Sequence, residues 1–192
     1  MLNMISTRIV DSIQKNGLIP KQEAEIYVFG FQTIFLKMLH IATMFLIGLS
    51  FHKAQETIVF IVLYSLIRIY AGGFHASSKV CCYLISFVII VGLLSIISNT
   101  HPNAHIQIIG TLISSILISF IAPLGSDNKP LDYLEVKRYK SRVRIILISY
   151  IAIAILMYYF KFYDDLLVLS LSLYIELIML IIRKFQILIY SS

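Results

Sequence analysis

The sequence predicts an all-α integral membrane protein, in which about six transmembrane helices follow an N-terminal amphipathic helix on the membrane surface. Two observations predict this fold class. Hydrophobic residues make up 59% of the 192 residues and charged residues only 14%, with a mean hydropathy of +0.88. The apolar residues also fall in long stretches, and a membrane-spanning helix needs about 20 of them. The composition excludes an ordinary soluble enzyme, a disordered tail and a nucleic-acid-binding module, because each needs far more polar surface.

The first 20 residues predict a helix that lies on the membrane and does not cross it. Apolar residues recur there at three- or four-residue spacing, at Leu2, Ile5, Ile9 and Ile13. Polar residues separate them, so one face of the helix is apolar. Gly17 and Pro20 are expected to end this helix. The segment has no continuous apolar stretch and no cleavage site, so we do not expect a signal peptide.

Six segments are expected to cross the membrane. The clearest two contain no Asp, Glu, Lys or Arg, and the others carry one or two ionisable residues each. Apolar residues surround most of each segment, as expected for helices with lipid on one side and neighbours on the other. We therefore expect residues 1–192 to form a single polytopic membrane domain. Its expected spans are residues 33–51, 57–74, 80–98, 104–124, 143–160 and 166–182.

The distribution of Lys and Arg predicts how the chain is oriented, because short cytoplasmic segments of membrane proteins carry an excess of basic residues. With the N-terminus inside, thirteen of the 16 basic residues fall on the cytoplasmic side. The outer loops hold only Lys53 and Lys161, and Lys37 lies within a span. We therefore expect both termini to be cytoplasmic, together with the loops at about 71–79 and 125–142.

The segment between the second and third expected spans contains the residues with the clearest chemical potential. The glycine pair at positions 72–73 can end the second span, because glycine accepts the left-handed conformation that closes a helix. Ser77 or Ser78 can then cap the third span. Cys81 and Cys82 would follow in its first turn or just beyond, where unpaired N–H groups and the helix dipole favour a thiolate.

His75 and Cys82 can form a catalytic dyad only if the helix is broken between them. On a continuous helix, seven residues would separate them by about 10.5 Å along the axis, too far for proton transfer. A break at the glycines lets His75 fold back over the start of the next helix and act as a base. Three other interpretations stay open: Cys82 as apolar packing, acylation of the vicinal cysteines, and a zinc site, for which two Cys and one His are few ligands.

Two motifs in this part of the chain are similar to those of a known family. The first contains Arg68, then Tyr70-Ala-Gly-Gly-Phe-His75-Ala, then Cys82; the second contains Pro123, Asn128-Lys129-Pro130-Leu131 and Glu135. With its length and hydrophobic segments, the chain resembles the accessory gene regulator B (AgrB) family. These proteins are membrane cysteine endopeptidases of peptide quorum sensing, and the resemblance covers nearly the whole chain.

The resemblance implies a defined reaction. His75 and Cys82 would be the catalytic residues, and the substrate would be an AgrD-like precursor with an amphipathic leader, a signal segment and an acidic tail. Cleavage through a Cys thioester would remove the tail and allow cyclisation to a thiolactone or lactone. No cofactor and no metal are expected. Cys81 departs from the family pattern, but helical geometry favours Cys82, about 20° from the direction of His75, over Cys81 at about 120°.

Other ionisable residues lie in or near the spans, where they are costly and normally paired. Glu176 could pair with Arg68 or Lys37, and Arg68 could orient a substrate carboxylate or reach toward the interface. The basic residues after the fourth span could attract the acidic tail or only anchor the loop. The expected substrate-binding residues are Arg68, Lys129, Lys137, Arg138 and Lys140.

Two function classes follow from these residues. The first is the peptide-processing peptidase, with the precursor peptide and membrane lipid as partners, a homodimer left open, and no nucleic acid. The alternative is a small transporter or exporter of a peptide or small molecule, with Arg68, Glu176 and His40 lining a polar path. The spacing of His75 and Cys82 at a cytoplasmic helix break favours the peptidase, because a transporter does not need it.

Overall fold

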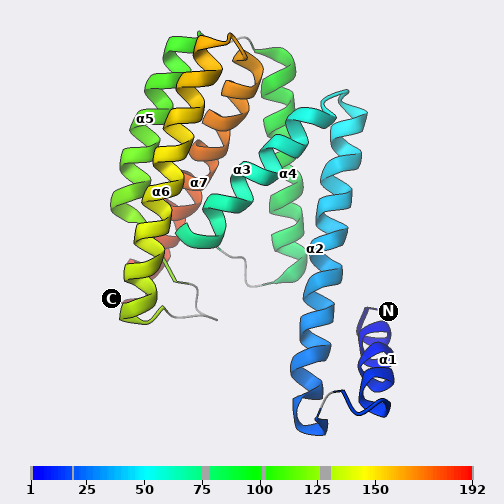
Figure 1. Cartoon of the computed structure of the whole chain (residues 1–192). Coiled ribbons are helices and arrows are strands. Elements are labelled where there is room, and N and C mark those ends of the chain that lie inside the picture. Colours follow the sequence, from blue (N-terminus) through cyan, green and yellow to red (C-terminus); the bar gives the residue numbers. More distant parts are fainter. Residues whose placement is uncertain (1, 19, 75–77, 101–102, 126–130, 192) are drawn as a thin grey trace. The chain divides into compact units, whose positions relative to one another are not determined.

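The chain forms seven α-helices within the part that the computed structural model describes, residues 2–18, 20–74, 78–100, 103–125 and 131–191. A short 3-10 helix, Lys21–Glu23, lies between the first two. Six helices, α2 to α7, are long and apolar enough to cross a membrane, so the predicted fold class is confirmed and the chain is a multi-pass membrane protein. The α-helices are α1 (Leu2–Lys15), α2 (Ala24–Ser50), α3 (Ala54–Ala71), α4 (Lys79–Asn99), α5 (Ala104–Ile121), α6 (Tyr133–Tyr159) and α7 (Tyr163–Ser191) (Figure 1).

The helices form two compact units, Met1–Leu46 and Ile47–Ser192, with the boundary inside α2. In the first unit, α1 precedes the spans as the sequence predicts. It ends before Gly17, whose φ of +70° lies in the left-handed region. The buried residues of α1 are Ser6 and Val10, which are 0% and 1% exposed, whereas Ile5 of the predicted apolar face is 40% exposed. The Gln32 side chain of α2 donates a hydrogen bond of 2.9 Å to the Asn3 side chain.

Helix α7 is the central helix of the second unit. It packs against α3, α4, α5 and α6, and it is more deeply buried than the other spans. Its side chains Leu169, Leu173 and Leu180 share one apolar core with Ile67 of α3 and Ile118 of α5. This arrangement places the residues of α7 beside the ends of several other helices, which matters for the site below.

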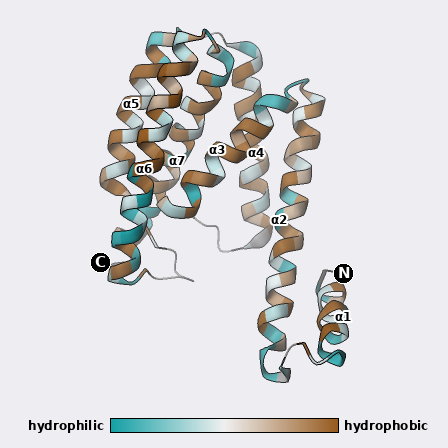
Figure 2. Ribbon diagram, viewed as in Figure 1, coloured by the Kyte–Doolittle hydropathy of each residue, from teal (hydrophilic) through white to brown (hydrophobic). Residues whose placement is uncertain are grey.

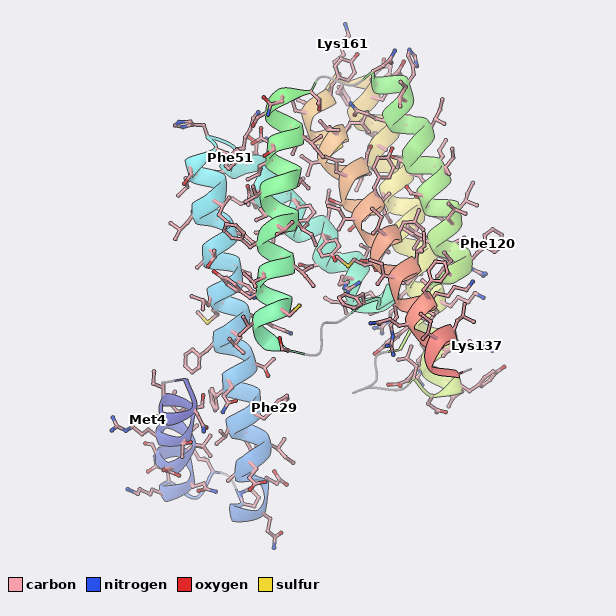
Figure 3. The ribbon with its side chains drawn as sticks, turned by 180° about the vertical axis from the view of Figure 1, so that it is seen from behind. Met4, Phe29, Phe51, Phe120, Lys137 and Lys161 are labelled. Atoms are coloured by element: carbon pink, nitrogen blue, oxygen red, sulfur yellow. The ribbon has the colours of Figure 1, made fainter. Side chains whose placement is uncertain are left out.

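Large apolar side chains also cover the outward faces of the second unit (Figure 2). Phe120, for example, is 79% exposed and points away from the bundle (Figure 3). Polar residues gather near the helix ends instead. A soluble protein rarely exposes so much contiguous apolar surface, whereas a helix in contact with lipid needs it.

The observed helix ends differ from the expected span ends at several places. Helices α2 and α6 begin at Ala24 and Tyr133, well before the apolar stretches that start at residues 33 and 143. The start of α6 is set by a capping box, in which Asp132 and Glu135 each bond the other's backbone N–H. Helix α5 stops at Ile121, shortly before Pro123, and α7 continues beyond residue 182 to Ser191. Hydropathy thus locates the part of each helix in contact with lipid, not where the helix ends.

Candidate active site

The sequence-predicted residues gather at one end of the second unit, which we call the break end. The break end comprises the end of α3, the starts of α4 and α6 and the C-terminal half of α7, from Glu176 onward; the opposite end holds the α2–α3, α4–α5 and α6–α7 connections (Figure 1). Lys137 and Lys161 mark these two ends (Figure 3).

Two glycines end helix α3, as predicted. The φ angles of Gly72 and Gly73 are +77° and +118°, both in the left-handed region that favours glycine. The Leu124 N–H donates a hydrogen bond of 2.9 Å to the Ala71 carbonyl, which brings the chain after α5 against this turn. A Cβ on Gly72 would lie 2.0 Å from the Leu124 carbonyl oxygen, so no side chain fits there.

Ser78 caps the start of helix α4, as one of the two predicted alternatives. Its hydroxyl accepts a hydrogen bond of 3.0 Å from the Cys81 N–H, and its carbonyl accepts one of 3.0 Å from the Cys82 N–H. Both cysteines therefore lie in the first turn of α4, which confirms the prediction. Cys81 is exposed and Cys82 is partly buried. Of the two thiols, Cys82 is the one turned toward the protein.

Arg68 connects the end of α3 to the break and to α7. Its Nη1 donates a hydrogen bond of 2.7 Å to the Gly72 carbonyl, and its Nη2 donates to the Phe74 carbonyl. Nη1 also lies 3.5 Å from Oε2 of Glu176, so Arg68, one of the two partners that the sequence offered, pairs with Glu176. The Phe74 N–H donates a 3.0 Å hydrogen bond to the Met179 carbonyl of α7. The backbone after α3 is thus bonded both to the Arg68 side chain of α3 and to the Met179 carbonyl of α7.

Tyr64 joins this cluster and was not predicted. It lies one helical turn before Arg68 on α3. The phenol ring stacks on Phe60 with a centroid distance of 5.3 Å. The four-residue spacing from Arg68 was the signal in the sequence that could have found it.

The second sequence motif meets the first at the break end. Besides the bond from Leu124 to Ala71, the buried Arg183 side chain of α7 donates from Nε to the Gly125 carbonyl at 3.1 Å. Arg183 was not singled out from the sequence, where it was counted only as an inner basic residue. Segments that are about 50 residues apart in the chain therefore lie side by side here.

Three of the expected substrate-binding lysines and arginines lie near the start of α6. Lys137 and Arg138 are exposed and Lys140 is half-buried. Nearby, the Tyr70 ring of α3 packs edge-on against Tyr139 of α6, and the Arg142 guanidinium lies 5.0 Å from the Tyr70 ring centroid. These contacts tie the basic part of α6 to the end of α3.

Several residues that the sequence singled out are not among the described residues of the break end. His75 and Lys129 lie outside the described residues, as does the expected turn at 128–130. Lys37 and His40 lie on α2 in the first unit. In the part of the chain that the structure describes, no group of three or more His, Cys, Asp or Glu side chains is placed to hold a metal ion.

Comparison with known proteins identifies the family. The family model described as Accessory gene regulator B matches residues 6–188, nearly the whole chain. The chain belongs to the AgrB family. An AgrB-like protein of Clostridium perfringens (strain SM101 / Type A) is 27% identical over 164 residues, covering 81% of this chain and 77% of that protein. The accessory gene regulator protein B of Staphylococcus aureus (strain Newman) is 32% identical over 111 residues, covering 58% and 59% of the two chains. No solved structure matches this chain.

Membership of the AgrB family gives the fold a biological setting. This chain is a multi-pass membrane protein of accessory gene regulation, a form of quorum sensing. The resemblance seen in the sequence is thereby confirmed at the level of the family.

Proposed function

We propose that this AgrB-family protein is a membrane cysteine endopeptidase that removes the acidic C-terminal tail of an AgrD-like precursor peptide, with His75 and Cys82 as the catalytic residues. The observation that carries the proposal is the helix break. Helix α3 ends at Ala71, α4 begins at Lys79 under the Ser78 cap, and Cys82 lies in the first turn of α4. His75 belongs to the segment between them, where it is not tied to the rise of a single continuous helix.

The start of α4 is a favourable place for a nucleophilic thiolate. The N–H groups of a first helical turn and the helix dipole stabilise negative charge nearby. Cys82 is partly buried, whereas Cys81 is exposed. We therefore assign the nucleophile to Cys82 and no chemical role to Cys81.

The reaction begins with acylation of Cys82. His75 accepts the thiol proton, and the thiolate attacks the carbonyl carbon that joins the signal segment to the tail. The C–N bond breaks, His75 gives its proton to the leaving amine, and the tail departs. The signal segment then remains on Cys82 as a thioester.

The second half of the reaction releases the product. A thioester keeps the acyl group activated, so a Cys thiol of the peptide can attack it and displace the Cys82 thiol. The products are a cyclic thiolactone and the free enzyme; a peptide Ser would give a lactone. Hydrolysis would compete in an open aqueous site, and a site among apolar membrane helices limits access of water.

Charged residues at the break end would recognise the precursor. We assign attraction of the acidic tail to Lys129, Lys137, Arg138 and Lys140, because clustered charge raises the local concentration of an oppositely charged partner. Arg68, at the end of α3, would orient a carboxylate of the substrate. The amphipathic leader would bind membrane lipid beside the enzyme.

We further propose that the break end, and with it the proposed site, lies at the cytoplasmic face with both termini inside, because the excess of basic residues favours this orientation. The test uses single cysteines at Tyr133 and Lys161 in a chain that carries Cys81→Ala and Cys82→Ala. A membrane-impermeant maleimide on intact cells should label position 161 and leave position 133 unlabelled. Labelling of position 133 would reverse the orientation.

The transporter or exporter alternative is supported less well. It gives no reason for a capped helix start with a partly buried thiol in its first turn, at the same end of the unit as a buried ion pair. The break end contains both.

The direct test is cleavage of a co-expressed precursor by variants of the three residues at the break. Cys82→Ala and His75→Ala should each abolish release of the tail, while membrane levels and precursor binding stay normal. Cys81→Ala is the matched control, since it removes the neighbouring thiol from the same helical turn, and it should keep most of the activity. Full cleavage by Cys82→Ala would overturn the proposal.

A further inference from the structure

Glu176 is a buried carboxylate whose position stability alone does not explain. Its side chain is 0% exposed in the middle of α7, the most buried span. Oε2 lies 3.5 Å from Arg68, at the long end of hydrogen-bond distances, and Oε1 accepts no hydrogen bond from any residue that the structure describes. Such pairs often cost more in lost solvation than they return in attraction. Ionisable residues inside membrane helices are instead typical of functional sites.

The partner of Glu176 shows what this carboxylate can control. Arg68 donates from two nitrogens of one planar guanidinium to the carbonyls of Gly72 and Phe74. The guanidinium is a rigid fork, so fixing its plane fixes both bonds together. Glu176 approaches the same Nη1 that bonds Gly72, and it does so from a different helix.

Two further contacts show that this arrangement is built into the chain. A Cβ on Gly73 would lie 2.1 Å from Nη1 of Arg68, so the guanidinium occupies space that only glycine leaves open. The Phe74 N–H bonds the Met179 carbonyl, three residues after Glu176 on α7. Helix α7 thus holds Phe74 twice, directly through Met179 and indirectly through Glu176 and Arg68.

We propose that Glu176 is a positioning residue: it holds Arg68 on the carbonyls of Gly72 and Phe74, and thereby fixes the backbone that leads directly into His75. The catalytic part of this role rests on the proposed function, in which His75 is the base. The structural part does not rest on it, because hydrogen exchange at the Phe74 amide can be measured without any cleavage of the precursor.

The test compares Glu176→Gln, Arg68→Lys and the double variant in purified full-length protein. The first readout is hydrogen exchange at the Phe74 amide, resolved by fragmentation of the peptide that contains it. The second is precursor cleavage, separated into the rate at saturation and KM. Glu56→Gln is the matched control: Glu56 forms a 2.8 Å ion pair with Lys53 at the opposite end, so the same substitution removes a charge pair far from the break.

In Glu176→Gln we expect exchange at Phe74 to rise about tenfold and the saturating rate to fall about tenfold, with KM nearly unchanged, since hydrogen bonds to charged groups are among the stronger ones. The double variant should be little worse than Arg68→Lys, because Glu176 acts through Arg68. Glu56→Gln should alter neither readout. If Glu176→Gln does not fold, Glu176→Asp replaces it, because the shorter side chain keeps the charge but draws the carboxylate away from Arg68.

Unchanged exchange at Phe74 would overturn the inference whatever the activity. Raised exchange with an unchanged saturating rate would also overturn it, since Glu176 would then be only structural. Additive losses in the double variant would show that Glu176 does not act through Arg68. The proposed function fails separately, if Cys82→Ala or His75→Ala still cleaves the precursor.

Discussion

The two ends of the second unit are built differently. At the break end, irregular backbone from one segment bonds to another: Leu124 to Ala71, Phe74 to Met179, and Gly125 to the Arg183 side chain. Two charged side chains, Glu176 and Arg183, are buried there.

At the opposite end, two polar contacts join side chains nearer the surface. The Tyr158 hydroxyl lies 3.2 Å from a ring nitrogen of His105, beside a pocket of about 470 Å³. Lys53 donates to Glu56 at 2.8 Å, and this hydrogen bond raises the pKa of the Lys53 ammonium.

The difference shows where the chain needs a fixed non-helical backbone. Inside a membrane, backbone outside a helix is tolerated only where the protein itself satisfies its polar groups. The break end does this with bonds between distant segments, and these bonds hold the chain that leads to His75. At the opposite end, the contact between distant segments named above, Tyr158 to His105, joins two side chains and no backbone group. The contrast predicts that similar substitutions at the two ends have very different effects on activity.

The largest effect is expected from Gly72→Ala. Its φ of +77° is strained for alanine, and the new Cβ would meet the Leu124 carbonyl at 2.0 Å. A left-handed non-glycine residue alone costs about 1–3 kcal/mol. We expect cleavage to fall at least about tenfold, the factor that 1.4 kcal/mol represents, with a lower thermal unfolding temperature in detergent.

Gly92→Ala in the middle of α4 is the control, because a Cβ there meets no atom within 4 Å. Alanine in a helix is favoured over glycine by about 0.5–1 kcal/mol, so this variant should be as stable as the parent or more so, with normal cleavage. Equal activity of the two alanine variants would show that the turn at Gly72 does not matter for the reaction.

A smaller and conditional effect is expected from the basic residues. Replacing Lys129, Lys137, Arg138 and Lys140 together by Gln should slow cleavage about tenfold at limiting precursor, where electrostatic attraction governs encounter. At saturating precursor the change should be small, and added salt should reduce the parent's advantage. Lys161→Gln, also exposed but at the opposite end, is the control. The quadruple variant could instead insert normally and process limiting precursor as fast as the parent. That result would show that these residues only set the orientation of the chain in the membrane.

The smallest effect is expected from Tyr158→Phe at the opposite end. It removes the hydroxyl that contacts His105 and leaves the ring in place, so the stability should fall by about 1 kcal/mol or less. Precursor cleavage should not change. A clear loss of cleavage in the folded variant would contradict the expected difference between the two ends, since it would show that they are coupled.

The sequence was sufficient to predict the local features of the break. The glycine pair, the Ser78 cap and the place of Cys82 in the first turn depend on residues close together in the chain, whose conformational preferences are strong. The apolar stretches likewise predicted six spans, and the short apolar spacing before them predicted a separate N-terminal helix.

The contacts between segments were not predictable in the same way. Lys37 and Arg68 were equally good partners for Glu176 in the sequence, and only helix packing selects Arg68. The bond from Leu124 to Ala71 uses backbone atoms, which leave no trace in residue type. Tyr64 resembled any aromatic residue of a span. The helix ends that lie beyond the apolar stretches were also not predicted, because hydropathy reflects contact with lipid and not helix capping.

The central claim is that Cys82 becomes acylated by the signal segment of the precursor. The most direct measurement uses a precursor whose ring-forming Cys is changed to Ala, so that the second half of the reaction is blocked. Purified protein is mixed with this precursor, digested and analysed by mass spectrometry. We expect the signal segment to be attached to Cys82, with the tail released in equal amount, and the adduct to disappear on treatment with hydroxylamine. An adduct on Cys81, or release of the tail with no thioester at Cys82, would contradict the claim.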